Sequence, residues 1–206
     1  SSNQALQRVR RRLLAAKGGH AGTLDPMATG MLPLCFGHAT KACGQLLGSS
    51  KCYRATLRLG SATDTGDADG SIVREAAVPA LDDRLVESVL AGFFGDRRQV
   101  PPMYSALKRN GVPLYELARA GQVVEREARR ITVHSLGLEG FDGGERASLV
   151  LRVHASKGTY IRTLGEAIGE ALGCGGHLSA LRRTATGHFE VSQCVTLEAL
   201  EAMTEN

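Results

Sequence analysis

Apolar side chains recur at helical spacing near the start of the chain. Leu6, Val9 and Leu13 lie three or four residues apart, and Ser1 precedes them as a potential helix cap. The pattern predicts one amphipathic helix that leads from the N-terminus to a glycine-rich loop beginning at Gly18. Its other positions are strongly basic, so this face is either exposed to solvent or turned toward an anionic partner.

Further along the chain, the hydrophobic pattern changes repeatedly between the strand period and the helix period. Alternation over residues 53–59, 131–137 and 148–155 predicts strands with one buried face. The remaining segments with a clear pattern are a buried strand at 31–37, helices at 41–47, 82–93 and 161–172, a basic strand at 175–183 and a helix from Thr196. Strands and helices mix without regular strand–helix–strand alternation, which predicts the α+β class.

The stretch from residue 18 to residue 30 holds four glycines, one proline and a single carboxylate. This composition predicts a loop with special backbone angles, because glycine and proline interrupt helices. Its carboxylate, Asp25, is the only acidic residue among the first 63, which contain nine Lys or Arg. Cationic surroundings keep a carboxylate ionised, and an ionised carboxylate can act as a nucleophile. The alternative is an Asp-Pro turn, with Pro26, that only shapes the loop.

The overall composition is that of a globular protein of one large domain or two small ones. Hydrophobic residues make up 43% of the 206 residues and charged residues 22%. We expect a cytoplasmic protein without membrane association, because we find neither a secretory signal nor a membrane-spanning run. The five cysteines include no Cys-x-x-Cys pair, so they predict free thiols rather than disulfides or a zinc site.

Charge is segregated along the chain. Residues 1–63 and 97–134 are basic, whereas residues 64–96 carry eight acidic side chains and two basic ones. Two Arg-rich blocks indicate contact with the phosphates of a nucleic acid, although solvated helical faces would give the same pattern. The second block also contains tyrosines and has low hydrophobicity, which predicts a protruding arm, at about residues 103–130, that becomes ordered against a partner.

Residues 62–70 are dense in Asp, Thr and Gly. A calcium loop is one reading, but the glutamate that closes such a loop at its twelfth position is missing. We therefore expect a turn-rich connection with one functional aspartate, and no metal site.

Several co-linear segments together resemble one family, the bacterial TruB tRNA pseudouridine synthases. The segments cover nearly the whole chain in order and spacing, and they are residues 20–33, Tyr53-Arg54, 63–70, 102–108, 126–129, 156–163 and Leu181-Arg182-Arg183. Two departures concern the ends: the family's catalytic domain normally starts with an earlier apolar strand, and its bacterial members usually carry a C-terminal PUA domain. The resemblance thus implies that residues 1–206 are a catalytic domain that lacks both.

The resemblance also implies a fold and an activity. The fold would be a mixed, mainly antiparallel sheet flanked by helices, with a basic RNA-binding arm. The activity would be isomerisation of one uridine in the T arm of tRNA, at position 55 in tRNA numbering, by base flipping and without a metal or small-molecule cofactor. The partner would be the tRNA T stem-loop, and we expect a monomer.

The resemblance assigns roles to residues at matching positions. Asp25 would be the essential carboxylate, Tyr160 would take the proton from uracil carbon 5, and Arg162 would pair with Asp25. Residues implied to bind the substrate are His20, Tyr53, Tyr160, Leu181, Asp67 and Lys41. The arm residues implied to grip the RNA are Tyr104, Lys108, Arg109, Tyr115, Arg119, Arg126 and Arg129.

Each of these side chains also has an ordinary interpretation. Tyr53 and Leu181 could be core residues, His20 a loop histidine with a satisfied hydrogen bond, and Arg162 half of a surface ion pair. Two rival functions remain open as well: a guide-RNA-dependent synthase acting on ribosomal RNA, and a tRNA-binding or folding factor without catalysis.

Overall fold

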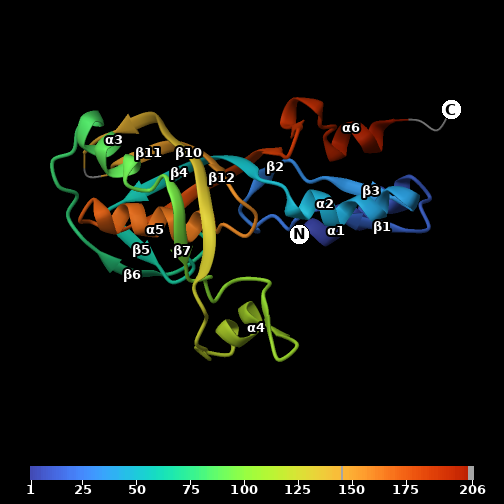
Figure 1. Cartoon of the computed structure of the whole chain (residues 1–206), viewed down its shortest axis with the longest axis horizontal. Helices are drawn as coiled ribbons and strands as arrows, with labels where there is room; N and C mark the ends of the chain where they lie inside the picture. The colour runs from blue at the N-terminus through green and yellow to red at the C-terminus, as the bar shows by residue number, and fades with distance from the viewer. Residues whose placement is uncertain (145, 204–206) are drawn as a thin grey trace. The chain divides into compact units, whose positions relative to one another are not determined.

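The computed structural model describes residues 1–144 and 146–203 and divides the chain into two compact units (Figure 1). Ser1–Tyr53 and Leu181–Asn206 form what we call the terminal unit, and Arg54–Ala180 form the central unit. Strands β4 (Lys51–Leu59) and β12 (Gly176–Thr186) each run from one unit into the other.

The terminal unit is built from short elements. Its helices are α1 (Ser2–Arg12), a 3₁₀ turn at Gly37–Ala42, α2 (Cys43–Gly48), a second 3₁₀ turn at Val191–Gln193 and α6 (Leu197–Ala202). Its strands are β1 (Gly18–His20), β2 (Thr29–Gly30), β3 (Leu34–Phe36) and β13 (Phe189–Glu190), besides its parts of β4 and β12. The antiparallel β1–β3 pair closes the glycine-rich segment into a loop.

The central unit carries most of the sheet. Its strands are β5 (Ser61–Thr63), β6 (Ile72–Glu75), β7 (Gly95–Gln99), β8 (Lys108–Arg109), β9 (Val112–Pro113), β10 (Arg129–Asp142) and β11 (Ser148–Ala155). Its helices are α3 (Asp83–Ala91), α4 (Leu114–Arg119) and α5 (Ile161–Ala171). The lobe around α4 projects away from the rest of this unit (Figure 1).

The main sheet has the strand order β13-β12-β4-β11-β10-β7, and β2 pairs with β12. The pairs β10–β11, β10–β7 and β12–β13 are antiparallel, whereas β2 and β12 are parallel. The predicted α+β class with a mixed, mainly antiparallel sheet is therefore confirmed.

Helix α5 owes its position to small residues on one face. A Cβ atom built at Gly169 would lie 2.4 Å from the backbone nitrogen of Gly176, so only glycine allows this approach of α5 to β12. Ile168 and Leu178 are fully buried beside this contact. The C-terminal half of α5 is thus held against the sheet.

The expected elements are confirmed where the hydrophobic pattern is complete. Strand β11 has the predicted bounds, α5 has the predicted start, and Asp82 caps α3 by accepting a hydrogen bond from Leu85 N at 2.7 Å. The predicted apolar stripe of α3 is only partly buried, since Leu85 is 46% exposed.

Other expectations were wrong. The first helix ends at Arg12 rather than at the glycine loop, because Leu14 takes a left-handed backbone conformation (φ 47°). Gly18–His20 and Thr29–Gly30 were expected to be loop, but they are strands, which pair with β3 and with β12 respectively. The strand predicted at residues 31–37 is formed only at Leu34–Phe36. The sequence analysis missed β6 and β7 altogether.

Candidate active site

The loop that carries Asp25 is tied down inside the terminal unit. Leu24 N donates a hydrogen bond to Ser2 Oγ at 2.8 Å, which attaches the loop to the first turn of α1. Ala28 N donates to the carbonyl oxygen of Asp25 at 2.9 Å and closes a tight turn. The half-buried Asp25 therefore sits on a segment whose backbone is fixed on both sides of it.

The strongest brace on this loop is Arg183, of which only 1% is exposed. Its Nε donates to Met31 O at 2.8 Å, and its Nη2 donates to Gly22 O at 3.1 Å, so one guanidinium holds both ends of the Asp25 loop. Gly30 passes so close that a Cβ there would lie 2.2 Å from Arg183 O, and its φ of +92° also requires glycine. Sequence reasoning gave Arg183 no role, although it shares a strand face with Leu181.

Tyr53 lies within electrostatic reach of both Asp25 and Arg183. Burial raises the pKa of the Tyr53 phenol. The positive charge of Arg183 and the hydrogen bond between Arg183 and Tyr53 lower this pKa, whereas the negative charge of Asp25 raises it further. The terminal unit thus gathers a carboxylate, a neutral aromatic ring and a buried cation. This is an arrangement that can hold a flat base beside a nucleophile.

Three further predicted residues belong to the same unit. His20 ends β1, and its Nδ1 is buried without a hydrogen-bond partner among the described residues, which does not favour the interpretation as a fully satisfied loop histidine. Leu181 is 5% exposed on β12, and Lys41 is exposed on the first 3₁₀ turn. The binding roles of these residues stay predictions.

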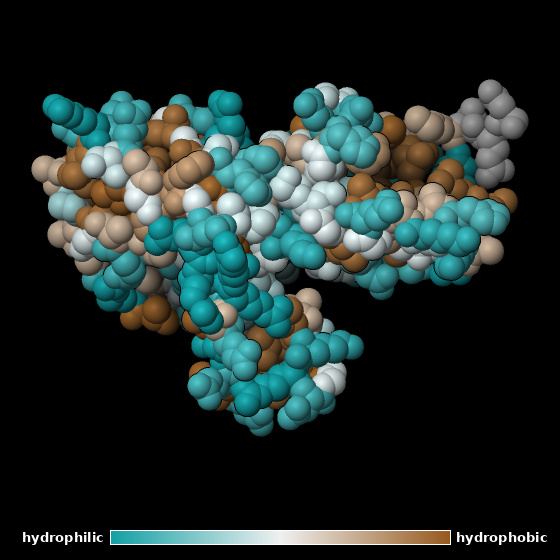
Figure 2. All heavy atoms as spheres, in the orientation of Figure 1, coloured by the Kyte–Doolittle hydropathy of each residue, from teal (hydrophilic) through white to brown (hydrophobic). Residues whose placement is uncertain are grey.

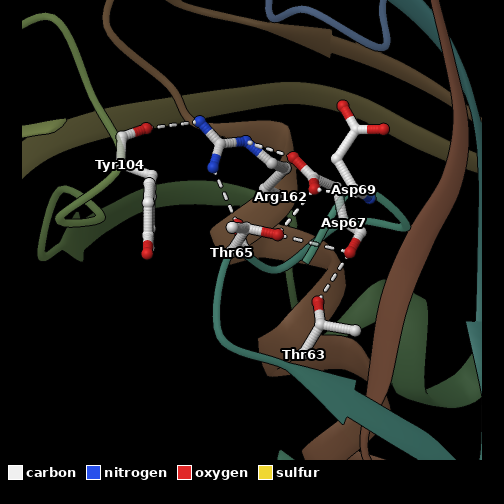
Figure 3. Close-up of polar contacts among 6 residues, drawn as sticks. All are labelled: Thr63, Thr65, Asp67, Asp69, Tyr104 and Arg162. Atoms are coloured by element: carbon white, nitrogen blue, oxygen red, sulfur yellow. Dashed lines mark hydrogen bonds and ion pairs between the residues drawn. The ribbon is translucent and has the colours of Figure 1, made fainter. Parts of the chain in front are cut away.

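In the central unit, Arg162 is the hub of a buried polar cluster (Figure 3). Only 4% of its side chain is exposed; its Nε lies 3.5 Å from Asp67 Oδ2, and its Nη1 donates to Thr65 O at 2.7 Å. Its Nη2 donates to Tyr104 O, also at 2.7 Å. The interpretation as a surface ion pair is therefore wrong, while the pairing of Arg162 with Asp25 stays a prediction.

Asp67 is held equally firmly, as Figure 3 shows. Its Oδ1 accepts hydrogen bonds from Thr65 Oγ1 at 2.6 Å and from Asp69 N at 3.1 Å. Its backbone carbonyl accepts from Thr63 Oγ1 at 2.7 Å. The Asp- and Thr-rich segment is therefore a turn that fixes one aspartate against Arg162.

The sequence analysis missed Glu166, one turn after Arg162 on α5. Burial raises the pKa of the Glu166 carboxyl. The positive charge of Arg162 lowers this pKa, and the negative charges of Asp67 and Glu170 raise it. The surroundings of Glu166 thus favour the neutral form of its carboxyl.

Tyr160 is the N-cap residue of α5. The side chain of Gln99 makes hydrogen bonds with both main-chain polar groups of Tyr160, at 2.8 and 3.0 Å. Sequence reasoning missed Gln99 as well, since no local signal links a glutamine at a strand end to a helix start 61 residues later.

The predicted arm contains its own secondary structure, the β8–β9 hairpin followed by α4. Lys108, Arg109, Arg119 and Arg129 are exposed, and the Arg119 guanidinium lies 5.4 Å from the centre of the Tyr115 ring. Figure 2 shows hydrophilic residues over much of the visible face of this lobe. Its ordering against RNA stays a prediction.

Within residues 1–144 and 146–203 no group of three or more His, Cys, Asp or Glu side chains is arranged to hold a metal ion. Among the helices in that part of the chain, none combines the length and the apolarity required to span a bilayer.

Comparison with known proteins identifies two matching domain families. Residues 10–161 match the TruB family pseudouridylate synthase N-terminal domain, and residues 162–206 match the tRNA pseudouridylate synthase B C-terminal domain.

Curated relatives and solved structures agree with these matches. The chain is 57% identical over 206 residues to a tRNA pseudouridine synthase B of Chromohalobacter salexigens, covering 98% of this chain and 64% of the relative. It is 58% identical over 203 residues to one of Aromatoleum aromaticum, covering 98% of this chain and 65% of the relative. The chain thus spans about two thirds of the length of these relatives.

Two of the similar solved structures are of Cbf5 complexes. A Cbf5–Nop10–Gar1 complex contains a chain with a TM-score of 0.69 and 30% identity, over 92% of this chain and 46% of that one. An archaeal box H/ACA sRNP Nop10–Cbf5 complex contains one with a TM-score of 0.68 and 28% identity, over 97% of this chain and 48% of that one.

Proposed function

The chain belongs to the TruB family of pseudouridylate synthases, and from that premise we propose that it isomerises a uridine in the T arm of tRNA, at position 55, to pseudouridine. The relatives named tRNA pseudouridine synthase B support tRNA as the substrate. The single observation that supports the chemistry best is the loop of Asp25, braced at both ends by the buried Arg183 and lying within electrostatic reach of Tyr53.

The reaction is an isomerisation, so every atom of the uridine is retained except for exchange of one proton. The bond between ribose carbon 1′ and uracil nitrogen 1 breaks, the uracil turns over, and carbon 1′ bonds to carbon 5. Carbon 5 then loses its proton to a base, and nitrogen 1 gains one. No electron donor or acceptor is required, so we propose a reaction without a cofactor.

Each role follows from the chemistry of the side chain. The target base must leave its stack at a cost of a few kcal/mol, and the flat ring of Tyr53 can offer a new stacking surface. Asp25 supplies the carboxylate that attacks the nucleoside or deprotonates its sugar. Tyr160 accepts the proton from carbon 5, and the predicted role of Arg162 is an ion pair with the Asp25 carboxylate.

The basic arm contributes recognition rather than chemistry. Exposed arginines and a tyrosine ring suit an RNA loop, which proteins recognise by shape, phosphates and stacking. Lys108, Arg109, Arg119 and Arg129 are the exposed cations of this surface.

A tritium-release assay tests the proposal. With tRNA labelled at uridine carbon 5, isomerisation must release the label into water, and we expect Asp25→Asn to lower the release at least about 10³-fold. Asp83→Asn, at an exposed first-turn position of α3, is the matched control and should keep the rate of the unsubstituted chain. Full release by Asp25→Asn would refute the role of Asp25.

The same assay separates the rival functions. Tight tRNA binding without any tritium release would favour a binding or folding factor. Release from ribosomal RNA only in the presence of a guide RNA would favour the guided enzyme, an alternative that the 57% identity to tRNA pseudouridine synthase B does not favour.

A further inference from the structure

Gln99 occupies the neck of the arm. It is the last residue of β7, and its cross-strand partner Arg129 is the first residue of β10. Residues 100–128 leave the sheet between these two positions. Gln99 therefore lies where the chain leaves the sheet to form the arm.

The side chain of Gln99 does not face solvent, since the residue is 8% exposed. Its Oε1 accepts a hydrogen bond from Tyr160 N at 2.8 Å, and its Nε2 donates to Tyr160 O at 3.0 Å. A planar amide that binds both main-chain groups of one residue restrains the two peptide planes on either side of it. Because those planes set the direction of the Cα–Cβ bond, Gln99 restrains the direction in which the Tyr160 side chain leaves the backbone.

The N-cap position makes this restraint more important. Tyr160 has extended backbone angles (φ −91°, ψ 110°), and no side chain of the helix start caps α5 at this residue. The backbone N–H of Tyr160 lies outside the hydrogen-bond ladder of the helix, and in this protein Gln99 satisfies it.

A second contact ties the same helix start to the arm. Arg162 Nη2 donates to Tyr104 O at 2.7 Å, five residues after Gln99. On the returning side of the neck, Arg126 Nη1 donates to Pro101 O at 3.2 Å. Of the two predicted catalytic residues of the central unit, Tyr160 is therefore attached to the strand end at the neck, and Arg162 is attached to the first segment of the arm.

We propose that Gln99 is a positioning residue, which fixes Tyr160 for proton transfer and links its placement to the neck of the RNA-binding arm. The proposal rests on the proposed function. Gln99 contacts no reacting atom in this account, so its loss should lower turnover and leave substrate binding almost unchanged. A misplacement of about 1 Å can cost about 10²-fold in rate.

Steady-state kinetics test the role in turnover. Gln99→Met keeps the length of the side chain and removes both hydrogen bonds, so we expect kcat to fall about 10- to 100-fold while KM changes less than about threefold. Gln99→Glu keeps the acceptor for Tyr160 N but places a carboxylate oxygen against Tyr160 O, so we expect its kcat also to lie below that of the unsubstituted chain. Gln45→Met, at an exposed position of α2, is the control and should behave like the unsubstituted chain.

Fluorine NMR tests the positioning itself without any activity. The chain has four tyrosines, so incorporation of 3-fluorotyrosine gives four signals, and Tyr160→Phe assigns the signal of interest. We expect Gln99→Met to shift or broaden the Tyr160 signal and to leave those of Tyr53 and Tyr115 in place. If Gln99→Met does not fold, Gln99→Glu is used for the same comparison.

The outcomes are distinguishable. No tritium release by the unsubstituted chain would refute the proposed function, whereas the Tyr160 signal would still report whether Gln99 positions this residue. A kcat within twofold of the unsubstituted chain, a change in KM alone, or an unmoved Tyr160 signal would overturn the positioning role.

Discussion

Replacement of Arg183 by methionine should weaken both the stability of the chain and the geometry of its Asp25 loop. Arg183 is 1% exposed and donates to Met31 O and Gly22 O, the two carbonyls that flank the loop. Methionine matches the aliphatic part of arginine in size but offers no donor. Both carbonyls would then remain in a buried environment without these partners.

The magnitude follows from these two hydrogen bonds. A hydrogen bond from a charged donor contributes about 1.5–3 kcal/mol, so two of them amount to about 3–6 kcal/mol. Removal of the desolvation cost of the buried guanidinium offsets part of this loss. We therefore expect the free energy of unfolding to decrease by about 3 kcal/mol, out of a total of about 5–15 kcal/mol for a typical domain.

Denaturant titration and tritium release measure the two consequences. Arg182→Met is the matched control, because the neighbouring side chain is exposed on the same strand. We expect it to change stability by less than about 0.5 kcal/mol. Under conditions where Arg183→Met stays folded, its turnover should still be lower than that of the control. A free energy of unfolding and a turnover equal to those of Arg182→Met would refute the bracing role of Arg183.

Three further predictions concern other parts of the chain. Asp82→Ala removes the cap of α3 and should lower the free energy of unfolding by about 1 kcal/mol in denaturant titration, with tritium release unchanged; an unchanged stability would contradict the capping contact. Burial and a hydrogen bond with Cys43 raise the pKa of Cys35 to about 11, so at pH 8 only about 0.1% of this thiol is thiolate. Mass spectrometry after brief alkylation should therefore find the exposed Cys194 modified and Cys35 intact. Arg119→Ala should weaken tRNA binding and reduce the slope of log Kd against log salt concentration by about 0.7–0.9, whereas an identical slope would exclude a phosphate contact.

Elements with one complete buried face could be predicted from the sequence. Every second residue of β11 from Leu149 to Ala155 is buried, and this alternation reproduced its bounds. The same holds for α5, where the apolar spacing and the Gly173 stop agree with the structure. Such segments can be predicted from local sequence, because the alternation or helical spacing of their buried side chains is visible in consecutive residues.

Elements without a complete apolar face could not be predicted. Strand β7 reads Gly-Asp-Arg-Arg-Gln and has no apolar alternation, since it forms an edge of the sheet. Its pairing is supported by polar contacts to β10 instead, as between Asp96 and Thr132 Oγ1 at 2.7 Å. No window of local sequence contains both partners.

The candidate site shows the same division. Asp25 stood out because it is isolated among basic residues and lies in a glycine-rich loop. Arg183 and Gln99 did not, because their importance comes from carbonyls and amides 152 and 61 residues away. A buried arginine and an exposed one look alike in sequence when the backbone groups that bind them are remote.

Mapping of pseudouridine in an unmodified tRNA transcript tests the central claim most directly. After incubation with the chain, carbodiimide derivatisation and primer extension should show a stop that reports pseudouridine at position 55 of the T arm, and the Asp25→Asn variant should leave that position as uridine. Absence of the stop after incubation with the unsubstituted chain, or an equal stop with Asp25→Asn, would contradict the account.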